Sequence, residues 1–226
     1  STTNKKFLKL KSTGTNSSSF AVNKLDNAPT GQVIITQDVK FYNNNSSILF
    51  KQDNPVTWSA NATAISFNFT GTEFNLNGGE KICDAVPGTW YKIVLSADVT
   101  SKLCFAKVYD AEGTLLGESD VTAFVNAGAT APVYLCYRTP DNSQGELDFN
   151  NVKMYTPEID GTKFTTTVAD ETISIPEAGE SDVTTTLTAK ALSTEGYDMI
   201  GEATWAFDES VTDTSSVAIT PDTTDS

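Results

Sequence analysis

The chain has 226 residues, of which 38% are hydrophobic, and a formal net charge of −14 at pH 7. It contains no histidine, which excludes Ser-His-Asp and Cys-His hydrolases as well as histidine-ligated zinc or haem sites. Arg138 is the single arginine and the chain lacks a basic stretch, so nucleic acid is not expected as a partner. No stretch approaches about 18 consecutive apolar residues, and we therefore expect no insertion into a membrane.

The negative charge is concentrated in the last third of the chain. Residues 1–158 carry 13 basic and 15 acidic side chains, a balance of −2, whereas residues 159–226 carry 2 basic and 14 acidic ones, a balance of −12. This difference predicts two modules, 1–158 and 159–226. Thr, Ser and Asn are abundant and no long stretch has helical periodicity, so we expect both modules to be all-β.

Short runs of alternating apolar and polar residues, separated by turn formers, predict the strands. Residues 120–125 fit either one helical turn or a loop. In the second module the expected strands are 165–168, 172–175, 182–192, 202–207 and 217–220. In the first module they are 5–10, 18–25, 32–42, 47–52, 56–60, 63–70, 73–76, 90–99, 103–110, 114–116, 132–137 and 147–155.

The segment from Trp90 to Glu118 organises the first module. Two alternating runs flank a short polar turn at residues 99–102, which predicts an antiparallel hairpin. If residues 98 and 103 pair, Lys92 lies opposite Tyr109 and Val94 opposite Lys107. Alternation assigns the more apolar set to the inner face and leaves the second set on an open outer face. The inner set is Tyr91, Ile93, Leu95, Ala97, Cys104, Ala106 and Val108, and the outer set includes Trp90, Lys92, Phe105, Lys107 and Tyr109.

The three cysteines are Cys83, Cys104 and Cys136. Their spacing fits no metal site, and alternation places Cys104 on an inner face. This pattern favours buried free thiols over the alternative of one disulfide with a spare thiol. We expect no required cofactor.

Three segments of the first module carry a family resemblance: FLKL with the serine-rich turn after it, the central TWYKIVLSADVTSKLCFAKVYDAEGTLL, and the closing LDFNNVKMYTP. With them, residues 1–158 resemble the lectin-type, concanavalin-like jelly-roll modules of secreted bacterial polysaccharide-degrading proteins. Residues 164–210, with TISIPEAGES, LTAKAL and ATWAF, resemble bacterial immunoglobulin-like repeats. The resemblances imply an antiparallel β-sandwich of jelly-roll type followed by a small, incomplete immunoglobulin-like sandwich. They also imply a secreted or cell-surface protein, with other modules on the same polypeptide and a polysaccharide as ligand.

A carbohydrate-binding face combines aromatic rings, which stack on sugar C–H patches, with amide, carboxylate or ammonium groups for the hydroxyls. The outer face of the hairpin supplies this mixture, and its two neighbouring amines favour a plant-type polysaccharide that is anionic or mixed, such as a pectic or other acidic glycan. The alternative to a binding face is that these are ordinary solvent-facing lysines over half-buried rings. For Trp58 the alternative is packing in the core. The candidate binding residues are Lys92, Phe105, Lys107, Tyr109, Trp58, Tyr42, Tyr134 and Arg138.

A structural calcium ion is a second candidate feature, because jelly-roll modules often hold one and calcium needs clustered carboxylate and carbonyl oxygens. Asp110 and Glu112 offer such oxygens, as do Asp141 with Asn142, or Asp148 with Asn150. The alternative for these residues is turn formation.

Two further functions compete with a non-catalytic binding module. A glycoside hydrolase needs two opposed carboxylates. Glu73 and Glu80 stand apart in the sequence, Glu112 and Glu118 flank a turn, and a lyase is disfavoured by the single arginine. The third alternative is a structural or adhesion spacer, with which the acidic second module agrees. We therefore expect binding without catalysis.

Overall fold

The computed structural model describes residues 6–12, 18–43, 45–54, 62–140 and 145–157, together with the backbone of four strands beyond residue 158. The chain divides into two compact units, Ser1–Pro157 and Glu158–Ser226. No helix among the described residues is long and apolar enough to cross a membrane.

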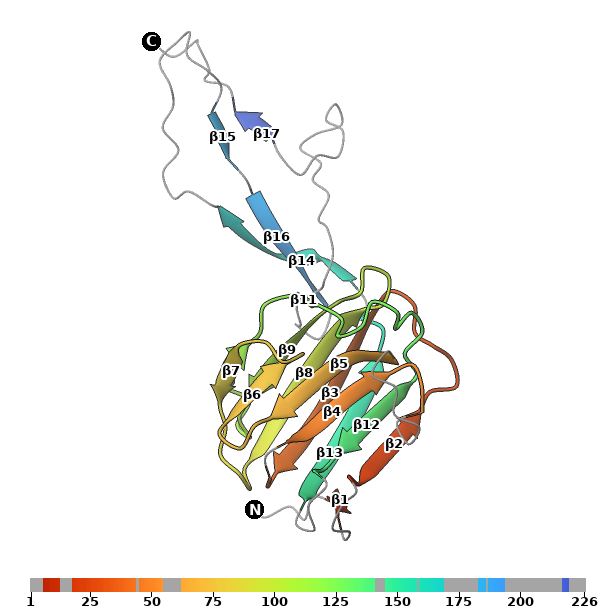
Figure 1. Cartoon of the computed structure of the whole chain (residues 1–226). Coiled ribbons are helices and arrows are strands. Elements are labelled where there is room, and N and C mark those ends of the chain that lie inside the picture. Colours follow the sequence, from red (N-terminus) through yellow and green to blue (C-terminus); the bar gives the residue numbers. More distant parts are fainter. Residues whose placement is uncertain are drawn as a thin grey trace, which may run out of the picture. The chain divides into compact units, whose positions relative to one another are not determined.

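The first unit is a sandwich of two antiparallel sheets (Figure 1). Sheet A contains, in spatial order, β1 (Leu8–Lys11), β13 (Glu146–Tyr155), β3 (Gln32–Phe41), β8 (Trp90–Asp98), β9 (Leu103–Tyr109) and β10 (Leu115–Glu118), with β11 (Thr122–Ala123) paired to β9. Sheet B contains β2 (Phe20–Lys24), β12 (Tyr134–Arg138), β4 (Ser46–Lys51), β5 (Thr63–Phe69), β6 (Glu73–Leu76) and β7 (Lys81–Asp84). The first four strands alternate between the sheets, as in a jelly roll. The prediction of an all-β sandwich is confirmed.

The core lies between the two sheets and is rich in aromatic rings. Phe74 is at its centre, with ring centroids 5.5 Å from Phe41, 5.2 Å from Phe67, 5.6 Å from Phe69 and 5.0 Å from Tyr91. These five rings come from both sheets, and each is fully or almost fully buried. Aromatic contacts of this kind stabilise a core beyond the area that they bury.

The hairpin of β8 and β9 has the predicted register. Asp98 pairs with Leu103, Lys92 with Tyr109 and Val94 with Lys107. The side chain of Asp98 holds the turn, since it accepts hydrogen bonds from the Thr100 amide at 2.9 Å and the Ser101 hydroxyl at 2.7 Å. The whole predicted inner face belongs to the core, namely Tyr91, Ile93, Leu95, Ala97, Cys104, Ala106 and Val108.

Several predicted elements differ from the structure. Strand β7 was not predicted. It has four residues at the edge of sheet B and only Cys83 is buried, so its sequence shows no clear alternation. Residues 120–125 contain β11 rather than a helical turn. The predicted strand 56–60 lies outside the described residues. All three cysteines are buried free thiols, as expected.

In the second unit, β14 (Ile159–Val168) pairs with β16 (Leu187–Ser193), and β15 (Val183–Thr185) pairs with β17 (Val217–Ile219). These strands overlap three of the predicted ones, whereas 172–175 and 202–207 lie outside the described residues. The described part of this unit shows β-structure, and its immunoglobulin-like arrangement stays a prediction.

Candidate functional site

The register of sheet A arranges its outward side chains in rows across the strands. One row runs from Lys9 on β1 through Asp148 on β13 and Lys40 on β3 to Trp90 on β8. The next row runs from Asn150 on β13 through Asp38 on β3 and Lys92 on β8 to Tyr109 on β9. Residues far apart in the sequence thus become neighbours on one face.

A pocket of about 250 Å³ lies on these two rows. Its walls come from β3, β8 and β13 and from the loop between β9 and β10. The volume falls below the range of about 300–1,000 Å³ that is typical of drug-sized ligands, so the pocket suits a smaller group. It is lined by Asp38, Trp90, Tyr91, Lys92, Asp110, Ala111, Glu112, Gly113 and Asn150.

The loop wall of the pocket is shaped by the side chain of Asp110. Its Oδ1 accepts hydrogen bonds from the amides of Thr114 at 2.7 Å and Glu112 at 3.0 Å. The bond from Thr114 stabilises the ionised carboxylate and so lowers the pKa of Asp110. Gly113 has a φ of 91°, a backbone conformation that glycine adopts readily. Glu112 is exposed at the tip of this loop.

The opposite wall is formed at a bulge in β13. The register with β3 shifts between Asn150 and Lys153, and Asn151 has a φ of 50°. The Asn151 amide donates to Oδ1 of Asn150 at 2.6 Å, and its side-chain amide donates to Oδ2 of Asp38. Bulges of this kind redirect side chains and occur often beside functional sites.

Trp90 connects the pocket to a group of aromatic rings. Phe7, which is 46% exposed, packs edge-on against it with ring centroids 5.8 Å apart. We call Phe7 and Trp90 the aromatic ledge. The ammonium of Lys40 lies 5.2 Å from the Trp90 ring centroid, 5.2 Å from that of Tyr42 and 6.0 Å from that of Phe7. Cation–π attraction therefore helps to hold these rings in place.

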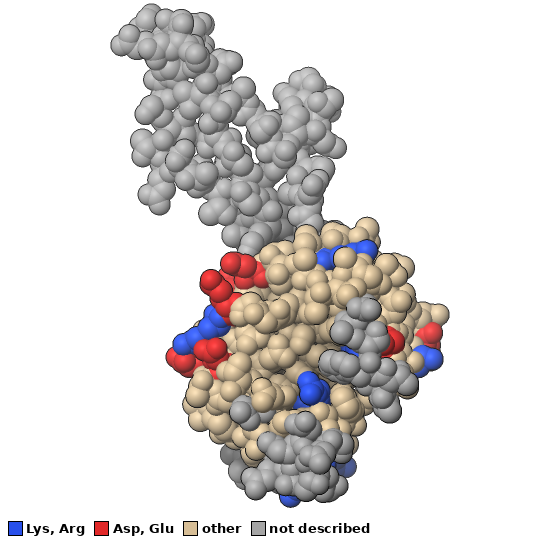
Figure 2. All heavy atoms as spheres, viewed as in Figure 1, with Lys and Arg blue, Asp and Glu red and all other residues tan. Residues whose placement is uncertain are grey.

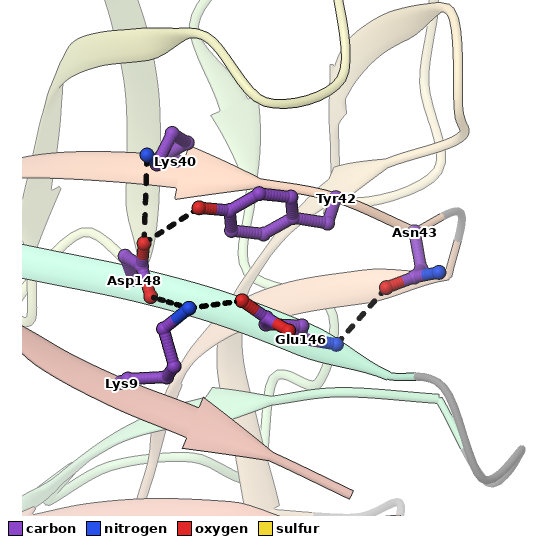
Figure 3. Close-up of polar contacts among 6 residues, drawn as sticks. All are labelled: Lys9, Lys40, Tyr42, Asn43, Glu146 and Asp148. Atoms are coloured by element: carbon purple, nitrogen blue, oxygen red, sulfur yellow. Dashed lines mark hydrogen bonds and ion pairs between the residues drawn. The ribbon is translucent and has the colours of Figure 1, made fainter.

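A polar network beside the ledge joins β1, β13 and β3. Figure 3 shows Asp148 between Lys9 and Lys40, with Nζ–Oδ distances of 3.7 Å and 3.6 Å. The Tyr42 hydroxyl donates to Oδ2 of the fully buried Asp148 at 2.7 Å. Lys9 also pairs with Glu146, and this hydrogen bond lowers the pKa of the Glu146 carboxyl. Two cations and a hydroxyl thus compensate the one buried carboxylate.

The outer face of the hairpin is less open than the alternation predicted. Phe105 and Lys107 are only 5% and 8% exposed, so the expectation of an open surface is wrong for them. Alternation assigns a side chain to a face, whereas exposure depends on what surrounds that face in three dimensions. Nζ of Lys107 lies 3.4 Å from Glu118, and Lys92 lies opposite Asp38. Each amine therefore has a carboxylate neighbour.

Two predicted binding residues lie on the other sheet. Tyr134 and Arg138 project from β12 on the outer side of sheet B, because the alternate residues Leu135 and Tyr137 enter the core. Nε of Arg138 donates to the Ser18 hydroxyl at 3.2 Å. Figure 2 shows the molecule from the side of sheet B, where charged groups are sparse and lie mainly at the edge.

The predicted binding residues are therefore divided between places. Lys92 lines the pocket, with Nζ 5.5 Å from the ring centroid of Tyr109. Tyr42 belongs to the network beside the ledge. Trp58 lies outside the described residues, as do Asp141 and Asn142.

The three proposed calcium ligands do not converge. Asp110 and Glu112 line the pocket, whereas Asp148 lies between two lysines. Among the residues that the structure describes, no group of three or more Asp, Glu, Cys or His side chains is placed to hold a metal ion.

The sequence prediction missed two contributors to this site, Asp38 and Phe7, and gave two others a different role: Asn150 was a candidate calcium ligand and Trp90 a structural residue. Asp38 has the outward parity of its strand, which is a signal that alternation provides. Asn150 and Phe7 reach the site through strand pairing across more than one hundred residues, as in the pair of Asn150 with Asp38. No local pattern reveals such pairing.

No protein-family model matches the chain, and no curated protein matches its sequence. Among solved structures, the chain is similar to a sialidase, with 14% identity and a TM-score of 0.48 over 66% of this chain and 15% of that chain. It is also similar to the catalytic domain of a glycoside hydrolase family 131 protein from Coprinopsis cinerea, with 11% identity and a TM-score of 0.42 over 59% of each chain. Peanut lectin gives 10% identity and a TM-score of 0.42 over 66% of this chain and 87% of that chain. The assignment of the architecture rests on the strand order and register described above.

Proposed function

We propose that the first unit binds carbohydrate without catalysis, at the pocket on sheet A and the aromatic ledge beside it. The observation that carries the proposal is the position of Trp90, which is both a wall of the pocket and half of the ledge. One sugar ring enters the pocket and the next stacks on the ledge. Sugar rings present C–H patches to aromatic faces and hydroxyls to polar groups, and this site offers both in one place.

The polar groups of the pocket suit sugar hydroxyls because they include donors and acceptors. Lys92 provides an ammonium donor, Asp38 a carboxylate acceptor and Asn150 an amide. The side chains of Asp38 and Asn150 are oriented by Asn151, so part of the conformational cost of ordering them is met before the ligand arrives. A site that is ordered in advance binds with less loss of entropy.

The setting that we propose is a secreted or cell-surface protein with several modules, in which this unit attaches the polypeptide to a polysaccharide. The second unit, with an immunoglobulin-like fold, acts as its spacer. A balance of −12 over residues 159–226 supports a spacer role, because net negative charge favours solubility and keeps neighbouring copies apart.

Glycoside hydrolysis is a second candidate, and one observation favours it. The carboxylates of Asp38 and Glu112 line the same pocket, and hydrolysis requires two carboxylates on either side of the scissile bond. We favour binding because one of these two carboxylates, that of Asp38, already accepts a hydrogen bond from the Asn151 side chain and lies opposite Lys92.

The test uses the whole chain on a glycan array, together with a reducing-sugar assay on every glycan that it binds. Binding without turnover is the expected result. Turnover that disappears in both Asp38→Asn and Glu112→Gln supports the hydrolase instead. Absence of binding to any glycan contradicts both and leaves the spacer.

A further inference from the structure

The pocket on sheet A has an acidic lining. Asp38, Asp110 and Glu112 contribute three carboxylates, against the single ammonium of Lys92. Two of the carboxylates are in the β9–β10 loop on one side and the third is on β3 on the other. The carboxylate charges are therefore distributed around the space that a ligand would occupy.

Among the described residues, two further cations on this face have carboxylate partners. Lys40 lies 3.6 Å from the buried Asp148, and Lys107 lies 3.4 Å from Glu118. Lys153 is opposite Thr36, one row beyond Asp38 and on the side away from the β9–β10 loop. Within the lining of the pocket itself, carboxylates therefore outnumber ammonium groups.

We propose that the pocket selects an amine-bearing sugar and discriminates against uronic acids. This inference rests on the proposed function and adds the chemical class of its ligand. A protonated amine near three carboxylates and one ammonium gains a net attraction, and a uronate in the same place meets a net repulsion. The ligand class differs from the acidic glycan that the two lysines had indicated on their own.

The test compares three probes of similar length: a glucosamine oligomer, its N-acetylated neutral counterpart and a galacturonate oligomer. Affinities are measured by titration calorimetry with the whole chain at about pH 6, where carboxylates are ionised and a sugar amine is protonated. We expect the glucosamine oligomer to bind roughly threefold to tenfold more tightly than the neutral one, since each partly exposed charge pair contributes modestly. The advantage should shrink as salt is raised. The galacturonate oligomer should bind most weakly.

Charge-removing variants connect the preference to the pocket. Asp38→Asn and Glu112→Gln keep the shape of each side chain and should each reduce the preference for the amine by roughly twofold to fivefold. Glu112 is exposed in a loop, so its variant retains the fold even if Asp38→Asn is less stable. Glu73→Gln is the matched control, because it removes a carboxylate from β6 of the other sheet.

The outcomes separate this inference from the proposed function. The charge selection is overturned if galacturonate binds more tightly than the other probes, or if all three probes bind equally. If Trp90→Ala then loses affinity, carbohydrate binding at this site remains in place. An amine preference that is unchanged in both pocket variants also overturns the inference. Absence of binding to all three probes contradicts the inference together with the function on which it rests.

Discussion

Asp38 on β3 and Lys92 on β8 are Cα partners in sheet A, and both side chains line the same pocket. The pair places a hydrogen-bond acceptor next to a donor, and Nζ of Lys92 lies 5.5 Å from the ring centroid of Tyr109. In the proposed binding mode, this arrangement positions the ammonium for a sugar hydroxyl.

The variant Lys92→Met keeps most of the stem and removes the charge. We expect it to weaken binding of the neutral N-acetylated oligomer by roughly threefold to tenfold, since one hydrogen bond from a charged donor is lost. Calorimetry measures the change, and Lys24→Met on β2 of sheet B is the control. Equal affinities of Lys92→Met and the parent chain would remove Lys92 from the site.

The hydrogen bond from Tyr42 to Asp148 should stabilise the fold. Tyr42→Phe removes the hydroxyl and leaves a fully buried carboxylate with one partner fewer. We expect the free energy of unfolding to fall by about 1–3 kcal/mol in urea titrations. Tyr134→Phe on the outer side of sheet B should change it by less than about 0.5 kcal/mol. If both variants are equally stable, the network contributes nothing through this bond.

Phe74 should be among the most sensitive positions of the core. It is fully buried and contacts four other rings, so Phe74→Ala is expected to cost about 3–5 kcal/mol of unfolding free energy. Phe7→Ala removes the same ring from a position that is 46% exposed, and its cost should be below about 1 kcal/mol. Similar losses in the two variants would contradict the assignment of Phe74 to the core.

The buried thiols should make the fold sensitive to alkali. Burial raises the pKa of Cys104 from 9.0 to about 12, and that of Cys83 to about 11. Because these folded-state values exceed the unfolded ones, the stability linked to the thiols is fully present below pH 9.0 and is lost as the pH rises toward about 12. Urea titrations across this window should show a falling free energy of unfolding. A flat profile would show that the thiols ionise equally in both states.

The hairpin of β8 and β9 could be predicted in detail because its determinants are local. Alternation fixes which residues face inward, and the four-residue polar turn at 99–102 fixes the register, so Lys92 opposite Tyr109 follows from sequence alone. The structure adds the reason for the turn, which is the Asp98 carboxylate that accepts two hydrogen bonds within it.

The pocket could not be predicted, since its walls meet only through long-range pairing. Asn150 pairs with Asp38 in the β13–β3 ladder, and the bulge in β13 brings the Asn151 side chain to Asp38. The burial of Phe105 and Lys107 was missed for a related reason: alternation cannot show how crowded a sheet face is. Asp148 lies between Lys9 and Lys40, which are distant from it in the sequence. The sequence alone therefore could not distinguish a carboxylate in an ion pair from a metal ligand.

The most direct measurement is the affinity of Trp90→Ala for the oligosaccharide that the parent chain binds most tightly, determined by titration calorimetry on the whole chain. Tyr134→Ala is the matched control, because it removes a ring that also neighbours a lysine but lies on the outer side of sheet B. We predict that Trp90→Ala loses at least about tenfold in affinity, or 1.4 kcal/mol, while Tyr134→Ala retains the parent value. Retained affinity in Trp90→Ala, or a loss confined to Tyr134→Ala, would contradict a binding site on sheet A.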